Sequence, residues 1–158
     1  MSRTLTTAAA VPFAHAWSLL EAYVDACPEA IWEEKNGGWP VWQQMLHAVT
    51  VLDFFTCGEQ PLLPAPAPQD VLMLSVQGTE MVDKDALRAY MAAVKSRVDA
   101  WLAALDDAAL PVKDARLSAA LGFEVSAMWV LVMLASHTQY HLGSCDAALR
   151  DHDLPGVF

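Results

Sequence analysis

The sequence has little positive charge, few cysteines and no long apolar run, and each shortage excludes a class of protein. Lys and Arg together number 9 against 19 Asp and Glu, so the formal net charge is −10. An acidic surface of this size repels phosphate backbones and anionic lipids, so we expect no nucleic-acid or membrane partner. The longest apolar run, 127–135, falls far short of the roughly 20 residues that cross a membrane.

The three cysteines are Cys27, Cys57 and Cys145, an odd number with no CxxC spacing. A disulfide framework is therefore not expected, and a reducing, cytoplasmic setting fits better. A hydrophobic content of 55% argues against disorder, and 158 residues can bury a substantial core. We therefore expect one domain over residues 1–158, of which residues 1–10 form a short flexible tail.

Helical periodicity dominates, and no convincing run of alternating apolar and polar residues is present. The spacing of apolar residues predicts four helices, over 13–27, 40–57, 83–105 and 123–150. Pro40 near the start of the second helix and Gly58 after its end fit the usual asymmetry of helix ends. Asp83 is placed to cap the third helix. The predicted fold class is all-α.

The segment 58–82 between the second and third helices is rich in proline and reads as extended chain. A helix of about 18 residues is roughly 27 Å long, and extended polyproline covers about 3.1 Å per residue. This segment is long enough to cross the whole bundle, so the second and third helices can run parallel. The other connections suit antiparallel neighbours, which predicts an up-down-down-up four-helix bundle with one long crossover.

Two of the five histidines, His137 and His141, stand four residues apart directly after the most apolar segment. Residues at this spacing share one face of a helix and lie close enough to bind one metal ion. The pair alone is equally compatible with buried structural histidines. No Glu follows the first His, so the zinc-protease motif lacks its general base.

His47 lies in the middle of the second predicted helix, among residues that otherwise build core. A single histidine there is commonly a hydrogen-bonded core residue. At the same level of the bundle as His137 and His141, it would complete a three-histidine site with an open coordination position. His15 and His152 are weaker candidates, and Cys145 is too far along the helix from His137 to join the same set.

The sequence resembles the DinB-like four-helix-bundle metalloproteins in two places. The first is Trp39 with His47 eight residues later, and the second is the motif "HTQYHLG" that begins at His137. This resemblance implies that His47, His137 and His141 bind a divalent metal, with zinc or nickel expected. Characterised relatives imply transferase or isomerase chemistry that uses a low-molecular-weight thiol as cosubstrate. Three positions depart from the pattern: Gln43 replaces an acidic residue, and Leu142 and Ser144 replace Arg and Gln.

The leading hypothesis is a metal-dependent enzyme that acts on a small molecule, of thiol S-transferase, isomerase or hydrolase type. Its pocket would be lined by Trp39, Gln43 and Tyr140, and no catalytic residue is assigned. The alternative is a non-catalytic dimeric bundle with structural or absent metal, which binds small molecules or serves in a stress response. A chain this apolar also leads us to expect a homodimer.

Overall fold

Seven helices and one two-stranded sheet make up the chain, which the computed structural model describes over residues 1–158. The prediction of a mostly helical protein is confirmed. The four long helices are α1 (Thr4–Ala26), α3 (Val41–Thr56), α5 (Lys84–Ala104) and α7 (Ala127–Asp151). The three short ones are α2 (Glu29–Trp32), α4 (Gln69–Leu72) and α6 (Ala115–Leu121). None of these helices is both long and apolar enough to span a membrane.

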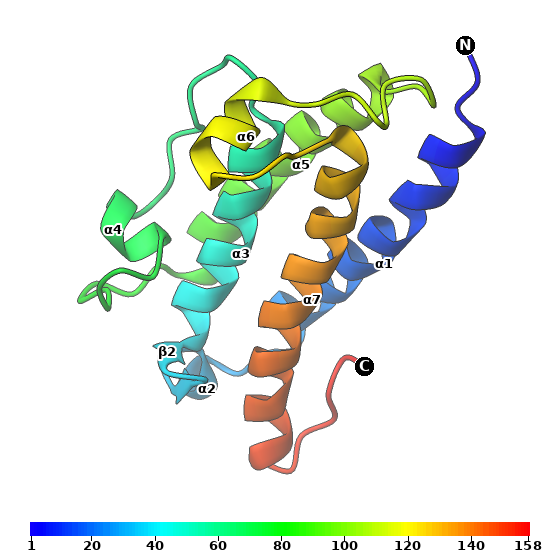
Figure 1. Ribbon diagram of the computed structural model, residues 1–158. Helices are drawn as coiled ribbons and strands as arrows, with labels where there is room; N and C mark the ends of the chain where they lie inside the picture. Colours follow the sequence, from blue (N-terminus) through cyan, green and yellow to red (C-terminus); the bar gives the residue numbers. More distant parts are fainter.

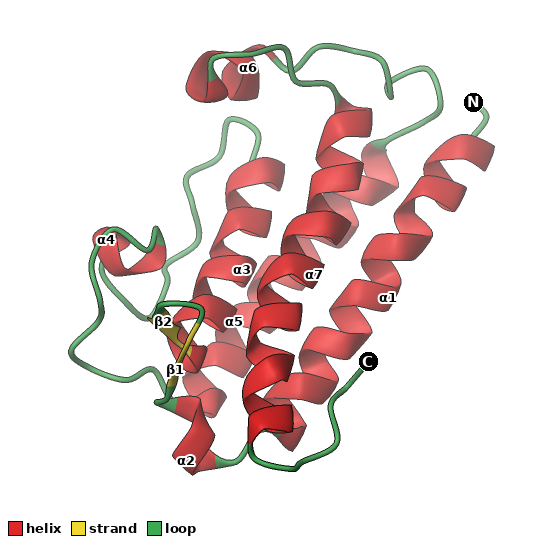
Figure 2. Cartoon of the chain, turned by 60° about the horizontal axis from the view of Figure 1, so that its bottom comes forward, coloured by secondary structure: helices red, strands yellow, loops and turns green.

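The four long helices lie side by side, as Figures 1 and 2 show. Near the starts of α3 and α5, Trp32 donates to the carbonyl of Val82 at 2.9 Å. Toward the other ends of these helices, Asp53 pairs with Arg97 at 2.6 Å. The two helices therefore run in the same direction, and the crossover 58–82 spans the length between them as predicted. α1 and α7 run the opposite way (Figure 1), and α1 packs chiefly on α7.

The first helix begins at Thr4, so the expected start at residue 13 and the expected tail at 1–10 are wrong for residues 4–10. Pro12 lies inside the helix. The start of α1 is held by Asp107, whose carboxylate accepts from the backbone N and the Oγ1 of Thr6 at 2.9 and 3.1 Å. This contact links residues about a hundred positions apart, so local sequence could not reveal it.

The last helix begins at Ala127, four residues later than predicted. Ser126 caps it by accepting from the backbone N of Trp129 at 3.3 Å. Just before it, the carbonyl of Val125 accepts from the backbone N of Asp114 at 2.8 Å. These bonds hold Val125 and Ser126 outside the helix, so α7 begins only at Ala127. Asp83 caps α5 as expected, through the backbone N of Ala86 at 2.7 Å.

A small antiparallel ladder, which the sequence analysis did not predict, precedes α3. It pairs β1 (Lys35–Asn36) with β2 (Trp39–Pro40). The turn between them is Gly37–Gly38, with φ of 60° and 94°. Two consecutive positive φ values match the tight hairpin turns that glycine favours. Strands of two residues are too short to show an alternating pattern, which explains the omission.

The crossover lies against the outer side of α3 (Figure 1). Its proline-rich start is tied down by Asp53, which is fully buried and accepts from the backbone N of Leu63 at 2.7 Å. Arg97 bonds both this carboxylate and the carbonyl of Pro61. Further on, the chain forms the single turn α4, which packs on α3. The crossover is therefore a fixed part of the structure that covers one side of α3.

Candidate metal centre

The packing of α3 on α7 determines which of their residues meet. The Sγ atom of Cys145, late in α7, lies 4.0 Å from the carbonyl oxygen of Val41, the first residue of α3. Because α3 and α7 are antiparallel, a residue some number of positions after Val41 faces the residue the same number of positions before Cys145. Six residues along α3 is His47, which faces the turn of α7 between His137 and His141. The tertiary structure thus brings together the three histidines that the sequence analysis selected.

The three imidazoles form one compact cluster. The ring centroid of His47 lies 5.2 Å from that of His137 and 4.8 Å from that of His141, and the last two are 4.7 Å apart. One ligand nitrogen from each ring lies within 4.8 Å of the others. Three nitrogens bound tetrahedrally at about 2.1 Å from a zinc ion are about 3.4 Å apart. The spacing of the three side chains is therefore near what one bound metal ion requires, and the group could hold one.

Burial keeps the three imidazoles neutral. His141 is buried, with 6% of its surface exposed, and His47 and His137 are half-buried. Desolvation lowers the pKa of His137 to about 4 and that of His141 to about 3, and repulsion between the rings adds to both effects. The pKa of His47 is also lowered by burial. Metal ions bind neutral imidazole, so the cluster is ready to act as a ligand set at neutral pH.

The ring nitrogens of the cluster differ in their partners. Nδ1 of His47 lies 2.7 Å from the carbonyl oxygen of Leu72 in the crossover. A carbonyl can only accept, so this nitrogen carries the proton and Nε2 keeps its lone pair. Nδ1 of His137 and Nδ1 of His141 are buried without any hydrogen-bond partner. Buried polar atoms without partners are rare and destabilising, and they indicate that something absent from the protein chain belongs here.

Three neutral nitrogens constitute the donor set, with no thiolate or carboxylate in the group. Imidazole suits zinc, nickel, copper and iron, and it is a poor match for magnesium or calcium. Three protein ligands leave at least one coordination position for water or substrate, which is the pattern of catalytic rather than structural zinc. The cluster could therefore hold a divalent transition metal with an open position.

The three residues expected to line a pocket lie in different surroundings. Tyr140 is 73% exposed, and its ring stands edge-on to His141 with the centroids 5.1 Å apart. Trp39 is half-buried in β2, where its carbonyl accepts from the side chain of Gln44. Gln43 is fully buried, and its amide bonds three backbone groups of the crossover. Of the three, Tyr140 is the one that contacts the histidine cluster.

The residues that depart from the DinB-like pattern also have clear positions. Leu142 is completely buried in the core and so stands where a charged Arg could not be accommodated without a partner. Ser144 lies beside the hairpin, where its Oγ fills the space next to Gly37. Gly143 is exposed on α7. Leu142 and Ser144 therefore help to pack α7 against its neighbours, and neither contributes a donor to the cluster.

The carbonyl of Leu72 is the one contact of the cluster that sequence reasoning missed. It belongs to the segment read as extended connection, and no sequence signal marks a backbone oxygen. The remaining candidates lie elsewhere: His15 is exposed on α1, and Nε2 of His152 lies 2.8 Å from a carboxylate oxygen of Glu34. Cys145 is a buried core residue, as expected.

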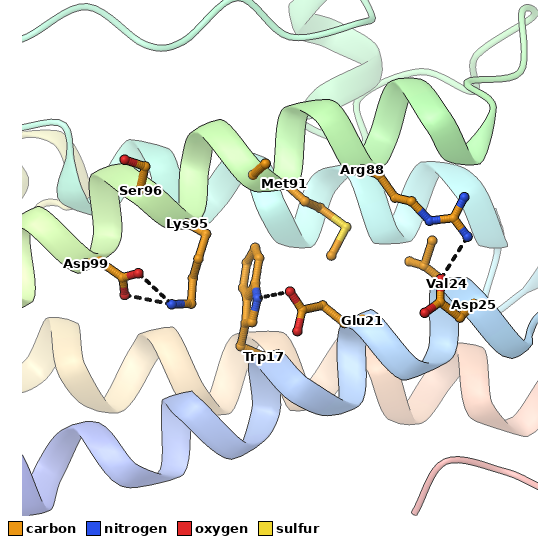
Figure 3. Close-up of a pocket in the computed structure, with 10 residues that line it drawn as sticks. Trp17, Glu21, Val24, Asp25, Arg88, Met91, Lys95, Ser96 and Asp99 are labelled. Carbon is orange, nitrogen blue, oxygen red and sulfur yellow. Dashed lines mark hydrogen bonds and ion pairs between the residues drawn. The ribbon is translucent and has the colours of Figure 1, made fainter.

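A cavity of about 640 Å³ lies between α1 and α5 (Figure 3). Its charged side chains and its indole are already partnered within the chain. The indole nitrogen of Trp17 donates to Glu21 at 2.7 Å, and Lys95 pairs with Asp99 at 2.7 Å. Arg88 pairs with an aspartate on each helix. The cavity lies away from the histidines and presents no unpaired donor or acceptor among these groups, so its size does not make it the stronger candidate.

Comparison with known proteins gives one match. A model of the DinB superfamily matches residues 13–145, which is well over half of the chain and includes all three histidines. No match was found among curated proteins or among solved structures.

Proposed function

The chain belongs to the DinB superfamily, and from this premise we propose that it binds one divalent metal ion through His47, His137 and His141. The observation that carries this proposal is the meeting of three neutral imidazoles whose buried Nδ1 atoms include two without partners. A structural core histidine would have its hydrogen bonds satisfied by the protein. Zinc and nickel are the metals we propose, because an all-imidazole donor set suits both.

We also propose that the four long helices form an up-down-down-up four-helix bundle, with the metal held between α3 and α7. Metal sites in such bundles are built from side chains on facing helices. The parallel direction of α3 and α5 and the long crossover between them support this assignment. A cytoplasmic setting fits the three cysteines, which are all free and buried.

The activity we propose is a reaction that uses a small thiol, either transfer of that thiol to an electrophilic small molecule or thiol-dependent isomerisation of the small molecule. Hydrolysis of a small molecule is the second reaction type. A divalent metal at this site supplies Lewis acidity, which lowers the pKa of a bound thiol or water toward neutrality. His47, His137 and His141, kept neutral by burial, would each supply one ring nitrogen to the metal. Tyr140, exposed beside His141, is placed to contact a substrate that approaches from solvent.

A second candidate is a non-catalytic bundle. The buried Gln43 supports it, because this residue replaces an acidic one and is occupied with backbone bonds, so it offers no general base. In that case the metal, if bound, would have a structural or sensing role. A screen of thiol transfer on model electrophiles with the metal-loaded protein separates the two candidates.

Elemental analysis of the purified protein tests metal binding directly. We expect about one zinc or nickel ion per chain and a rise in melting temperature when zinc is added to chelator-treated protein. His137→Ala should abolish both effects. His15→Ala, an exposed histidine on α1, is the matched control and should change neither. A wild-type protein without metal, whose melting temperature ignores added zinc and nickel, would refute the proposal.

We further propose a homodimer that forms through the uncharged face of α1 and α7. The stretches 4–20 and 127–145 contain no Asp, Glu, Lys or Arg, although the chain carries a net charge of −10. α1 and α7 pack together, and Leu5, Met128 and Val132 are 60%, 37% and 58% exposed. Two acidic copies repel each other elsewhere, so a neutral apolar face is the surface that a second copy can cover.

Light scattering after gel filtration tests the dimer. Wild-type protein should have twice the mass of one chain, and Val132→Glu should be monomeric because the interface would then bury two unpaired carboxylates. Val76→Glu, an exposed valine in the crossover, should leave the dimer intact. A monomeric wild-type protein would rule out this assembly.

A further inference from the structure

Gln43 is a fully buried glutamine that joins α3 to the crossover. Its Nε2 donates to the carbonyl oxygens of Val71 and Val76 at 2.9 and 2.7 Å, and its Oε1 accepts from the backbone N of Gly78 at 3.0 Å. All three partners are backbone groups of the crossover. Gly78 in turn packs so tightly on Trp42 that no side chain fits there. A single side chain of α3 therefore fixes the path of this segment.

The same turn of the crossover contains Leu74, a non-glycine residue with a φ of 55°. The left-handed region is unfavourable for a leucine, so such a turn persists only when its surroundings hold it. Gln43 bonds the chain on both sides of Leu74, at Val71 and at Val76. The glutamine thus stabilises a backbone shape that the crossover would not keep by itself.

Leu72, between these two bonds, provides the carbonyl that accepts from Nδ1 of His47. His47 and Gln43 are one helical turn apart on α3, and they bind the neighbouring carbonyls of Leu72 and Val71. The position of the Leu72 carbonyl therefore depends on the bonds that Gln43 makes. That carbonyl decides which nitrogen of His47 carries the proton.

We infer that Gln43 is a positioning residue of the metal centre, which holds the crossover so that the Leu72 carbonyl keeps the Nε2 lone pair of His47 available. The effect on metal binding rests on the proposed function, whereas the positioning of His47 rests on the hydrogen bonds alone. Partners that orient a ligating histidine typically change metal affinity 10- to 100-fold when they are lost. Gln43 acts at one further remove, so we expect about a 10-fold loss of zinc affinity.

The neighbouring Gln44 provides a matched control. It is buried too, and its side-chain amide donates to the carbonyls of Asn36 and Trp39, which belong to the hairpin. Gln44 therefore fixes a different segment with the same chemistry. Methionine has nearly the same length and volume as glutamine but makes no strong hydrogen bond, so Gln43→Met and Gln44→Met remove the bonds while the space stays filled.

Two measurements on these variants test the inference. The first is zinc affinity, by competition with a chelating indicator. The second is the tautomer of His47 in metal-free protein, from the ¹⁵N shifts of its ring nitrogens at pH 7.5. We expect both variants to melt at lower temperature than wild type, but only Gln43→Met to lose zinc affinity and to show a mixed tautomer at His47.

Wild-type affinity and a pure Nδ1–H tautomer in Gln43→Met would overturn the inference. Equal losses of zinc affinity in Gln43→Met and Gln44→Met would also overturn it, since general destabilisation would then explain them. If wild-type protein binds no zinc, the proposed function fails, and the tautomer measurement still decides whether Gln43 positions His47. If Gln43→Met does not fold, Gln43→Asn, which is shorter but keeps the amide, takes its place.

Discussion

The seam between α3 and α7 contains the three histidines, and the groove between α1 and α5 is the cavity of Figure 3. The two regions differ in one decisive way. The groove is large, and the indole and ion pairs that line it satisfy one another. The seam contains a cluster of buried imidazoles, two of which have an unpartnered nitrogen. Polar groups without partners, rather than empty volume, indicate where a ligand belongs.

The two regions also differ in what they contribute to folding. The side chains of the groove pack and pair within the chain, so they stabilise it directly. The histidines of the seam are desolvated without full compensation, so they destabilise the metal-free protein. A site that weakens the fold in the absence of its ligand is typical of function, and the following variants test this difference.

The largest effect on stability should come from the groove. Trp17 is 4% exposed and donates to Glu21. Trp17→Ala should lower the free energy of unfolding by about 3–5 kcal/mol, as expected for loss of a buried aromatic side chain. Urea unfolding measures the loss. Well below its melting temperature this variant should still bind zinc like wild type, and a loss of zinc there would mean that groove and seam are one functional unit.

A change in the seam should act in the opposite direction. His141→Leu removes a buried imidazole with an unpartnered nitrogen. The metal-free variant should be more stable than metal-free wild type by about 1–3 kcal/mol, because the desolvation of the unpaired atom no longer opposes folding. Zinc should no longer raise its melting temperature. The neighbouring Gln139→Leu is the control, and a destabilised His141→Leu would contradict this account of the seam.

Acid should weaken metal-free protein through the seam. The folded-state pKa values of His137 and His141 are about 4 and about 3, below the ordinary imidazole value of about 6.5. The unfolded chain therefore binds more protons than the folded one as pH falls below about 6.5, so stability declines from there toward pH 4. Urea unfolding as a function of pH measures the slope. His141→Leu should flatten it, and an unchanged slope would show that other groups dominate.

The smallest effect should come from a surface pair of the groove. Lys95 pairs with Asp99 one turn away and stands 5.9 Å from the centroid of the Trp17 ring. Because Lys95 is partly exposed, Lys95→Met should lower the free energy of unfolding by no more than about 1 kcal/mol. The loss should shrink in 1 M salt, which screens such pairs. Equilibrium unfolding at two salt concentrations provides the measurement, and a salt-independent loss would assign the effect to packing instead.

Local patterns predicted both ends of α3 and α5 to within one residue, and the length of the segment 58–82 allowed for their parallel run. They failed at α1, because Asp107 stabilises a helix start that the nearby sequence does not favour. They failed at the start of α7 for a similar reason, since the bond between Asp114 and Val125 joins two loops. In both places a partner distant in the sequence determines the boundary.

For the site, the sequence by itself determined the donors and part of their geometry. Helical spacing places His137 and His141 on one face, because a helix repeats every 3.6 residues whatever its surroundings. Only the tertiary structure decided that His47 meets them, that Leu72 orients it, and that Gln43 serves the crossover rather than a pocket. These contacts depend on how α3, α7 and the crossover pack, and packing couples residues whose separation along the chain carries no information about their distance in space.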